Sequence, residues 1–132
     1  MNIMPHLQLE INVPILSEER LGLSKWVVSE YCSVFEASSE EMAVTICDYS
    51  TDQMYLGGVH HPQKGIAFIN IDIFSTADEE GKRNLSESLM KGLNERLDIP
   101  VSSIYVIFRE ISQKNLYRFE PDRVISEPDK VK

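Results

Sequence analysis

The clearest pattern in the chain is an alternation of apolar and polar residues that occurs twice. It runs through residues 6–13 and again through residues 65–74, and a period of two is typical of a strand with one buried face. Each alternating segment is followed by a stretch with helical periodicity and then by a second short apolar run. The pattern therefore predicts, in chain order, a strand at 6–13, a helix at 17–35, a strand at 42–47, a strand at 65–74, a helix that ends before Pro100 and a strand at 103–111.

Both predicted helices carry signals for their first turn. Ser17 is the expected N-cap of the first helix, and Thr76 with Glu79 has the spacing of a capping box before the second. Leucines recur at every fourth position of the second helix, at Leu85, Leu89, Leu93 and Leu97. Such a stripe on an otherwise polar helix must lie on an apolar surface, which the predicted strands supply.

The two halves of the chain repeat with a period of about 60 residues, since strand 6–13 corresponds to 66–73 and strand 43–48 to 105–110. A helix that crosses between two strands lets them run parallel, and right-handed crossovers place both helices on one face. We therefore predict an α/β (α+β) fold, in which two β-α-β repeats form a four-stranded mixed sheet with two helices on one face. The other face is expected to be apolar and uncovered, which predicts burial against identical neighbours.

Length and charge narrow the possible classes of protein. The chain has 132 residues, of which 21 are acidic and 13 basic, so its net charge is −8. One domain is expected at this length. The negative charge argues against nucleic acid and anionic membrane surfaces as partners, because both require a basic patch. No apolar run approaches the roughly 20 residues of a membrane span, so we expect a cytoplasmic protein.

The cysteines and histidines do not predict a metal site. Cys32 lies in an apolar helical pattern and Cys47 in an apolar strand pattern, where buried free thiols usually occur. The histidines are His6, His60 and His61, and the last two lie in a turn-like stretch where adjacent side chains point apart. We expect inert core thiols and no metal ligands.

The sequence also predicts where two further side chains lie. Trp26, on the first predicted helix, is expected in the core because a tryptophan buries a large area. Asp72 is expected on the sheet face opposite that of Ile71 and Ile73. There it would be a hydrogen-bonded acid at an interface or, if buried, a proton donor with a raised pKa.

Several short motifs occur in an order that resembles a known family. Met4-Pro5 precedes the first strand, Ala43-Val44 begins the second, Leu56-Gly57-Gly58 forms a turn and Ile104-Tyr105-Val106 begins the last. Together with the two-fold repeat, this order resembles the tautomerase superfamily. The spacing is closest to its long-chain members, macrophage migration inhibitory factor and cis-3-chloroacrylic acid dehalogenase.

The resemblance also gives the expected domain boundaries. It covers residues 5–119, which form a single tautomerase-like domain with pseudo-repeats at about 5–59 and 65–119. Residues 1–4 are then an N-terminal extension. Residues 120–132, which contain Glu-Pro-Asp twice, are expected to be a solvated C-terminal tail.

The resemblance implies a trimer whose three sheets form a central barrel, with each active site at a subunit boundary and an amino-terminal proline as the catalytic base. An apolar pocket penalises the charged form of such a secondary amine, which keeps it available to move a proton between carbon and oxygen of a keto-enol substrate. The matching position in this chain is Pro5.

In the printed sequence, the nitrogen of Pro5 is an amide, because residues 1–4 precede it. An amide nitrogen has no basic lone pair. Two alternatives stay open. Either translation starts at Met4, whose removal exposes Pro5, or Met1 is the true start and the reaction of the family is lost.

Other polar positions of the family are changed in this chain. The lysine that macrophage migration inhibitory factor carries after its first helix falls on Ala37, its late tyrosine on Tyr105 and its nearby asparagine on Ile107. The substrate-clamping arginines of the dehalogenase fall on Phe74 and Ala77. The resemblance therefore implies a substrate site with Tyr105, Ile107 and Phe74. It argues against dehalogenation, which needs cations to hold the carboxylate.

Three basic residues are candidates to orient an acidic substrate near the proline. Lys64 precedes the third strand, Arg109 is on the last strand, and Arg118 is in the segment that a trimer would lay over a neighbour. A bidentate arginine suits a carboxylate. In the alternative, structural interpretation, Arg109 and Arg118 pair with Glu110 and Glu120 at the surface, where such pairs are common and weak.

These observations support hypotheses from different classes. The first is a tautomerase (isomerase) that catalyses keto-enol proton transfer on a small keto acid or aromatic enol through an exposed Pro5, assisted by Tyr105, Lys64 or Arg109 and with no cofactor. The second is a non-catalytic trimeric relative that serves in binding, because Pro5 is not amino-terminal and polar residues of the family are missing. A regulatory subunit of a mixed trimer is the third. The first two predict a homotrimer.

Overall fold

The computed structural model describes residues 5–36, 39–57, 64–74 and 77–126, so the expectations for residues 1–4, Ala37, Gly58, His60, His61 and Thr76 lie outside the described part. The helices and strands are β1 (His6–Ile11), α1 (Ser17–Val34), β2 (Ala43–Asp48), β3 (Ala67–Phe74), α2 (Glu79–Leu97), β4 (Ile104–Ile111), β5 (Tyr117–Glu120) and β6 (Arg123–Ser126). The short 3-10 helices are η1 (Ser39–Glu41), η2 (Thr51–Gln53), η4 (Val101–Ser103) and η5 (Gln113–Asn115). The elements from β1 to β4 are those that the hydrophobic pattern predicts.

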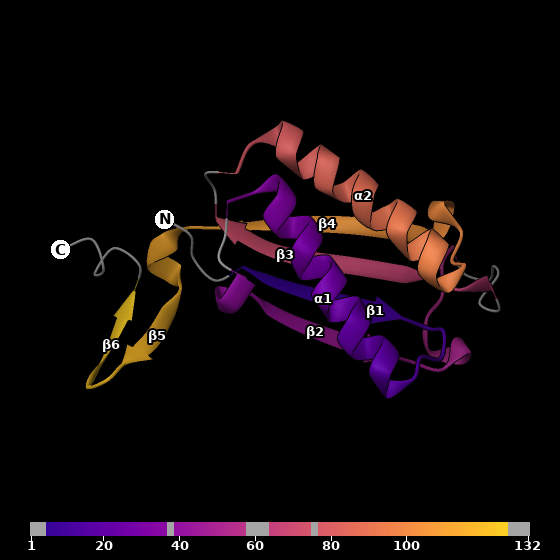
Figure 1. Cartoon of the computed structure of the whole chain (residues 1–132), viewed down its shortest axis with the longest axis horizontal. Helices are drawn as coiled ribbons and strands as arrows, with labels where there is room; N and C mark the ends of the chain where they lie inside the picture. Colours follow the sequence, from indigo (N-terminus) through magenta and orange to yellow (C-terminus); the bar gives the residue numbers. More distant parts are fainter. Residues whose placement is uncertain (1–4, 37–38, 58–63, 75–76, 127–132) are drawn as a thin grey trace.

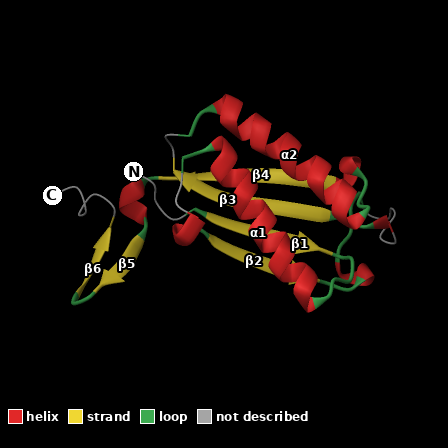
Figure 2. Ribbon diagram, viewed as in Figure 1, coloured by secondary structure: helices red, strands yellow, loops and turns green. Residues whose placement is uncertain are grey.

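The main sheet has four strands in the order β2-β1-β3-β4. β1 runs parallel to β2, and β3 runs parallel to β4, whereas β1 and β3 are antiparallel. Both α-helices lie on the same side of this sheet (Figure 1, Figure 2). The predicted fold, a mixed four-stranded sheet of two β-α-β units with the helices on one face, is confirmed.

The core lies between the helices and one face of the sheet. Alternate residues of β1 and β3 supply it from the sheet, as the period of two predicts, and α2 supplies three leucines with no exposed surface. These buried residues are Leu7, Leu9, Ile11, Ala67, Ile69, Ile71, Ile73, Leu85, Leu89 and Leu93. The fourth leucine of the predicted stripe, Leu97, is half-buried at the end of the helix. Trp26 is also half-buried and packs against the core from α1.

The helix caps differ from the predicted ones. The N-cap of α1 is Leu16, whose backbone N–H donates to the Glu19 carboxylate at 2.7 Å, so Ser17 is the first helical residue and not the cap. The N-cap of α2 is Asp78, whose carboxylate accepts from the N–H of Gly81 at 2.6 Å. A carboxylate fills the capping role in both helices, and it also suits the positive end of the helix dipole.

The sheet face opposite the helices is not the apolar face that the pattern predicts. It carries the side chains of alternate residues that face away from the core, and we call it the open face. Its members are His6, Gln8, Glu10, Ala43, Thr45, Cys47, Phe68, Asn70, Asp72, Tyr105, Ile107 and Arg109. Polar and charged groups predominate at the end where β1 begins, and Phe68 and Tyr105 stack at the other end with ring centroids 5.7 Å apart.

The segment after β4 forms a hairpin of its own. β5 and β6 pair antiparallel as a separate two-stranded sheet, which projects from the end of the main sheet (Figure 1). This hairpin includes residues 123–126 of the expected solvated tail, and Ile125 and Ser126 are buried. The turn between the strands is made by Pro121 and Asp122, which belong to the first Glu-Pro-Asp motif.

The two cysteines are free thiols, but neither is fully buried. The Cys32 sulfur lies 3.7 Å from the Met42 sulfur between α1 and the start of β2. Cys47 lies on the open face, paired in register with Glu10. The expectation of two buried core thiols is therefore wrong, because the strand that carries Cys47 turns this residue away from the helices.

Candidate functional site

Pro5 lies at the corner of the sheet where β1 begins. The residue is buried, and its carbonyl oxygen accepts a hydrogen bond from the Ala43 N–H at 3.1 Å. This bond continues the pairing of β1 with β2 by one residue. Because β3 and β4 run the other way, their carboxyl ends lie at this same end of the sheet.

A row of four polar side chains crosses the open face next to this corner, with one residue from each strand. The row runs from Thr45 on β2 through His6 on β1 and Asp72 on β3 to Arg109 on β4. The Nε2 of His6 and the Oγ1 of Thr45 are 2.8 Å apart, and the Nδ1 of His6 lies 3.6 Å from the Oδ2 of Asp72. We call these four residues the polar row.

Asp72 is the centre of the polar row because its carboxylate faces both neighbouring strands. Its Oδ1 accepts a hydrogen bond from the Nε of Arg109 at 2.8 Å, while its Oδ2 faces His6. This hydrogen bond, with the negative charge of Asp72, raises the pKa of the Arg109 guanidinium above its usual value. Asp72 is thus an ion-paired acid. It holds the guanidinium of Arg109, which lies on β4, two strands away from His6.

The geometry brings some of the predicted site residues together. Phe74 is the last residue of β3 and is buried, and Arg109 lies on β4 in register with Asp72. Adjacent strands are about 4.8 Å apart, so the backbones of His6 and Arg109 are separated by roughly 10 Å. A small substrate at the Pro5 corner is within reach of the Arg109 side chain.

Other predicted site residues lie elsewhere in the single chain. Tyr105 is near the other end of the open face and Ile107 is near its middle, with 43% and 42% of their surface exposed. Lys64 precedes β3 and is exposed at the end of the sheet opposite Pro5, so the prediction that it lies near Pro5 is wrong within one chain. The reason is the antiparallel pairing of β1 with β3, which puts the beginnings of these strands at opposite ends.

The two arginines have different surroundings. Arg109 pairs with Asp72, and the expected pairing with Glu110 is wrong because successive residues of a strand point to opposite faces. Glu110 instead binds the ammonium group of Lys82 on α2. Arg118 is half-buried on β5 opposite Ile125, and its expected pairing with Glu120 lies outside the described side chains.

Sequence reasoning missed His6 and Thr45 as members of the site. His6 is adjacent to Pro5 in the chain, which is a usable signal. Its contacts depend on the β1–β3 register that sets His6 opposite Asp72, and this register joins residues far apart in the sequence. The residues alone do not give that pairing.

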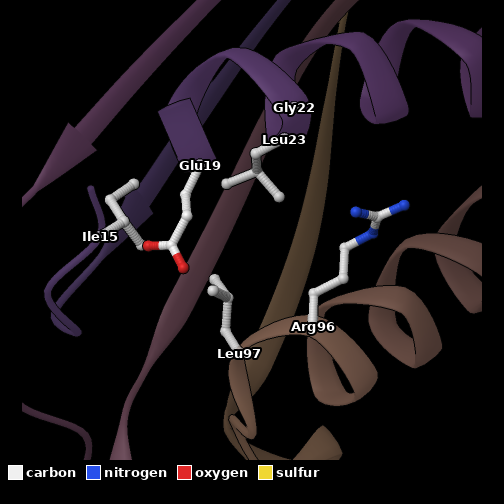
Figure 3. A pocket seen from close by; sticks show the side chains of 6 residues that line it. All are labelled: Ile15, Glu19, Gly22, Leu23, Arg96 and Leu97. Atoms are coloured by element: carbon white, nitrogen blue, oxygen red, sulfur yellow. The ribbon is translucent and has the colours of Figure 1, made fainter. Parts of the chain in front are cut away.

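A hollow of about 220 Å³ between the start of α1 and the end of α2 is a second candidate for a binding site. Figure 3 shows Glu19 and Leu23 of α1 facing Leu97 of α2, with Arg96 beside them. Both charged residues already have structural partners. Glu19 accepts the Leu16 N–H, and the guanidinium carbon of Arg96 lies 4.7 Å from the centre of the Trp26 ring. We therefore place the candidate site at the Pro5 corner and not in this hollow.

The described residues show no metal centre and no membrane helix. Within residues 5–36, 39–57, 64–74 and 77–126, no three or more histidine, cysteine, aspartate or glutamate side chains are grouped so that they could hold a metal ion. No helix in the same ranges is long and apolar enough to cross a membrane.

Comparisons with known proteins agree on the fold. Residues 68–121 match the family model described as tautomerase enzyme. The fold is similar to that of a macrophage migration inhibitory factor-like protein from Entamoeba histolytica, with a TM-score of 0.75, 19% identity and coverage of 92% of this chain and 98% of that one. It is also similar to N1, a member of the cis-3-chloroacrylic acid dehalogenase family, with a TM-score of 0.78, 20% identity and coverage of 96% and 87%.

A third similar structure is the F6 fused 4-OT, solved as an asymmetric trimer, with a TM-score of 0.75, 17% identity and coverage of 89% of this chain and 94% of that one. No curated protein is a significant match to the sequence. At these identities the likeness to solved structures describes the fold, while the match over residues 68–121 comes from the sequence itself.

Proposed function

We propose that this chain is a tautomerase that acts on a small enolisable keto acid, with Pro5 as the base once Pro5 is the amino-terminal residue. The match of residues 68–121 to the tautomerase family model and the similarity of the fold to the solved structures named above support this proposal. The observation that carries this proposal is the position of Pro5 directly before β1, at the sheet corner beside the polar row. A free proline nitrogen there would be a secondary amine in a buried setting, which favours its neutral, basic form.

Each step of the reaction has a candidate group. The Pro5 amine takes a proton from carbon and returns it to oxygen, or the reverse, so that atoms and charge balance over the keto-enol exchange. Arg109 supplies the charge that a keto acid needs. Its Nε is held by Asp72, and the terminal nitrogens of a guanidinium carry further donors for a carboxylate. No step in this scheme requires a cofactor.

Self-association is part of the proposal. The hairpin presents Tyr117, Phe119 and Val124 on one face, with 62%, 72% and 57% of their surface exposed. Exposed aromatic residues on a two-stranded hairpin favour an external partner, because such a hairpin is marginally stable alone in water. A similar fold has been solved as a trimer, and we propose the same assembly here, with Tyr105 and Ile107 of a neighbouring chain completing the site.

Turnover of phenylpyruvate and hydroxyphenylpyruvate enols by two forms of the protein tests the catalytic proposal. The form that begins at Pro5 should accelerate ketonisation, whereas the form that retains residues 1–4 should not. Replacing Pro5 by Ala in the active form should lower kcat/KM at least about 100-fold, the usual contribution of a general base. Pro14→Ala is the matched control, since Pro14 is exposed beyond the end of β1. Absence of turnover in a folded form that begins at Pro5 would overturn the proposal.

A non-catalytic binding protein is the second candidate, and one observation favours it. In the 132-residue chain the Pro5 nitrogen is an amide, and the cation nearest in the polar row, Arg109, is already paired with Asp72. If the form that begins at Pro5 is inactive but still binds a keto acid in a calorimetric titration, this second function replaces the first.

Light scattering in solution tests the assembly. The measured mass should be three times the chain mass of 15.1 kDa. Phe119→Ser should shift the population toward single chains. Leu21→Ser removes a residue of similar exposure, 58%, from the surface of α1 and should leave the mass unchanged. A monomeric parent protein would contradict this part of the proposal.

A further inference from the structure

His6 directly follows Pro5 and is held from both neighbouring strands. Its Nε2 lies 2.8 Å from the Thr45 hydroxyl on β2, and its Nδ1 lies 3.6 Å from the Asp72 carboxylate on β3. The backbone of Pro5 is held to β2 by the hydrogen bond from the Ala43 N–H. A single peptide unit joins Pro5 to His6, so any contact that fixes His6 also restricts the proline.

We propose that His6 is a positioning residue for Pro5, which holds Pro5 at the start of β1 and, when its imidazole is protonated, disfavours protonation of the Pro5 amine. This inference rests on the proposed function, because only an amino-terminal Pro5 has an amine to influence. His6 then acts through Pro5.

The number of hydrogen bonds that the His6 imidazole can donate depends on its protonation state. A neutral imidazole has one N–H, so it donates to only one of its two neighbours. A protonated imidazole has two N–H groups, so it can donate to the Thr45 hydroxyl while its charge forms an ion pair with the Asp72 carboxylate, whose Oδ2 lies 3.6 Å from Nδ1. The Pro5 corner is therefore held most tightly when His6 carries a charge.

The other charged groups of the open face are already paired or lie further along the sheet. Every strand of the sheet places titratable groups on or beside this face, and they are Glu10 on β1, Cys47 on β2 with Tyr49 just after it, Asp72 on β3, and Tyr105 and Arg109 on β4. Asp72 is already paired with Arg109. Glu10 is four residues further along β1 and receives hydrogen bonds from Gln8 and Asn70. Protonation of His6 thus adds positive charge one residue from the proline nitrogen.

Amide hydrogen exchange in the full 132-residue chain tests the positioning. His6→Leu should speed exchange of the Ala43 amide about fivefold, because loss of one hydrogen bond loosens the corner. Gln8→Leu is the matched control. Gln8 lies on the same face of β1, but its hydrogen bond stays within the strand and goes to Glu10. Equal Ala43 exchange in His6→Leu and the parent protein would overturn the inference.

A pH profile of the form that begins at Pro5 tests the charge effect, which a purely structural role would not produce. His6→Gln keeps a hydrogen-bonding side chain without the charge. The acid limb of kcat/KM should move to higher pH by about half a unit, the size of one charge acting over several ångströms in water. KM should change little, since the proposed effect of His6 is on the protonation of Pro5.

Different experimental results would contradict the tautomerase proposal and the proposal about His6. If the parent form that begins at Pro5 shows no turnover, the proposed function fails, and the exchange measurement alone decides whether His6 positions Pro5. If that form is active but His6→Gln leaves the acid limb in place, the inference about His6 is overturned while the tautomerase proposal stands.

Discussion

Trp26 of α1 occupies the space that a side chain at Gly92 of α2 would need. A Cβ atom built on Gly92 would lie 1.9 Å from the Cζ2 of Trp26, far inside van der Waals contact. Arg96, four residues further along α2, also lies near this ring, with its guanidinium carbon 4.7 Å from the ring centre. The distance between the two helices therefore depends on the missing side chain of Gly92.

Gly92→Ala should destabilise the protein by about 1–3 kcal/mol, because the added methyl forces Trp26 or the helices to move. This cost exceeds the gain of about 1 kcal/mol that alanine brings to a helix interior. Urea unfolding followed by Trp26 fluorescence measures the change.

Gly22→Ala is the matched control for this prediction. Gly22 lies on the exposed side of α1, and a Cβ there meets nothing within 4 Å. The control should stabilise the protein by roughly 0.5–1 kcal/mol. A gain of stability in both variants would contradict the predicted clash between a side chain at position 92 and Trp26.

Asn12 is a fully buried polar residue just after β1. Its Oδ1 accepts the backbone N–H of Ile66 at 2.7 Å, which ties the end of β1 to the beginning of β3. Asn12→Leu should cost about 1–3 kcal/mol in the free energy of unfolding, because the Ile66 N–H stays buried without this acceptor. Thermal unfolding of Asn12→Leu and of Asn84→Leu, a change on the exposed surface of α2, provides the comparison. Equal loss in the two variants would contradict the prediction.

We expect the folded protein to lose stability in alkali because of the buried Tyr31. Burial in the core, with a smaller contribution from Cys32, raises the pKa of its phenol from 10.0 to about 12. The folded chain therefore keeps a proton that the unfolded chain releases. The resulting stabilisation is complete below pH 10 and is lost as the pH rises through about 12. Urea unfolding of the parent protein and Tyr31→Phe over this range should show the steeper decline in the parent, and parallel declines would refute the assignment.

We expect the folded protein to lose a little stability in acid because of the ion pair between Arg20 and Asp48. The hydrogen bond from Arg20 to Asp48, at 2.6 Å, joins α1 to the end of β2 and lowers the pKa of the Asp48 carboxyl below 3.8. The stabilisation is present above pH 3.8 and is lost as the pH falls through the lowered value. Both side chains are partly exposed, so the pair should contribute less than about 1 kcal/mol.

A double-mutant cycle with Arg20→Gln and Asp48→Asn isolates this contribution at neutral pH and in acid. The coupling between the two residues should be measurable at neutral pH and absent once Asp48 is protonated. A coupling that is the same at both pH values would contradict an electrostatic origin.

The main sheet could be predicted because its signals are local. Leu7, Leu9 and Ile11 alternate with polar residues over a few positions, and the same period in β3 indicates a second copy of the unit. The caps were predicted less well. Ser17 is a preferred cap residue, yet the carboxylate of Glu19 one turn further on satisfies the first free N–H.

The polar row could not be read from the sequence because it depends on pairing over long distances. His6 and Asp72 meet only through the register of β1 with β3, and the pairing of β3 with β4 then adds Arg109. The hairpin was missed for a different reason. Pro121 and Asp122 are residues of tight turns as well as of solvated tails, and only the aromatic alternation at Tyr117 and Phe119 distinguishes the two.

The repeated β-α-β unit gives the molecule two corresponding corners, one before β1 and one before β3. With strand 6–13 laid on 66–73, Pro5 at one corner corresponds to Gly65 at the other. Gly65 has a φ of +94°, and a Cβ there would lie 3.0 Å from both Ile99 and Val13. The ring of a proline fixes φ near −65°, so the second corner cannot accept one. The two corresponding backbone positions therefore differ in conformation, and a proline ring fits at only the first of them.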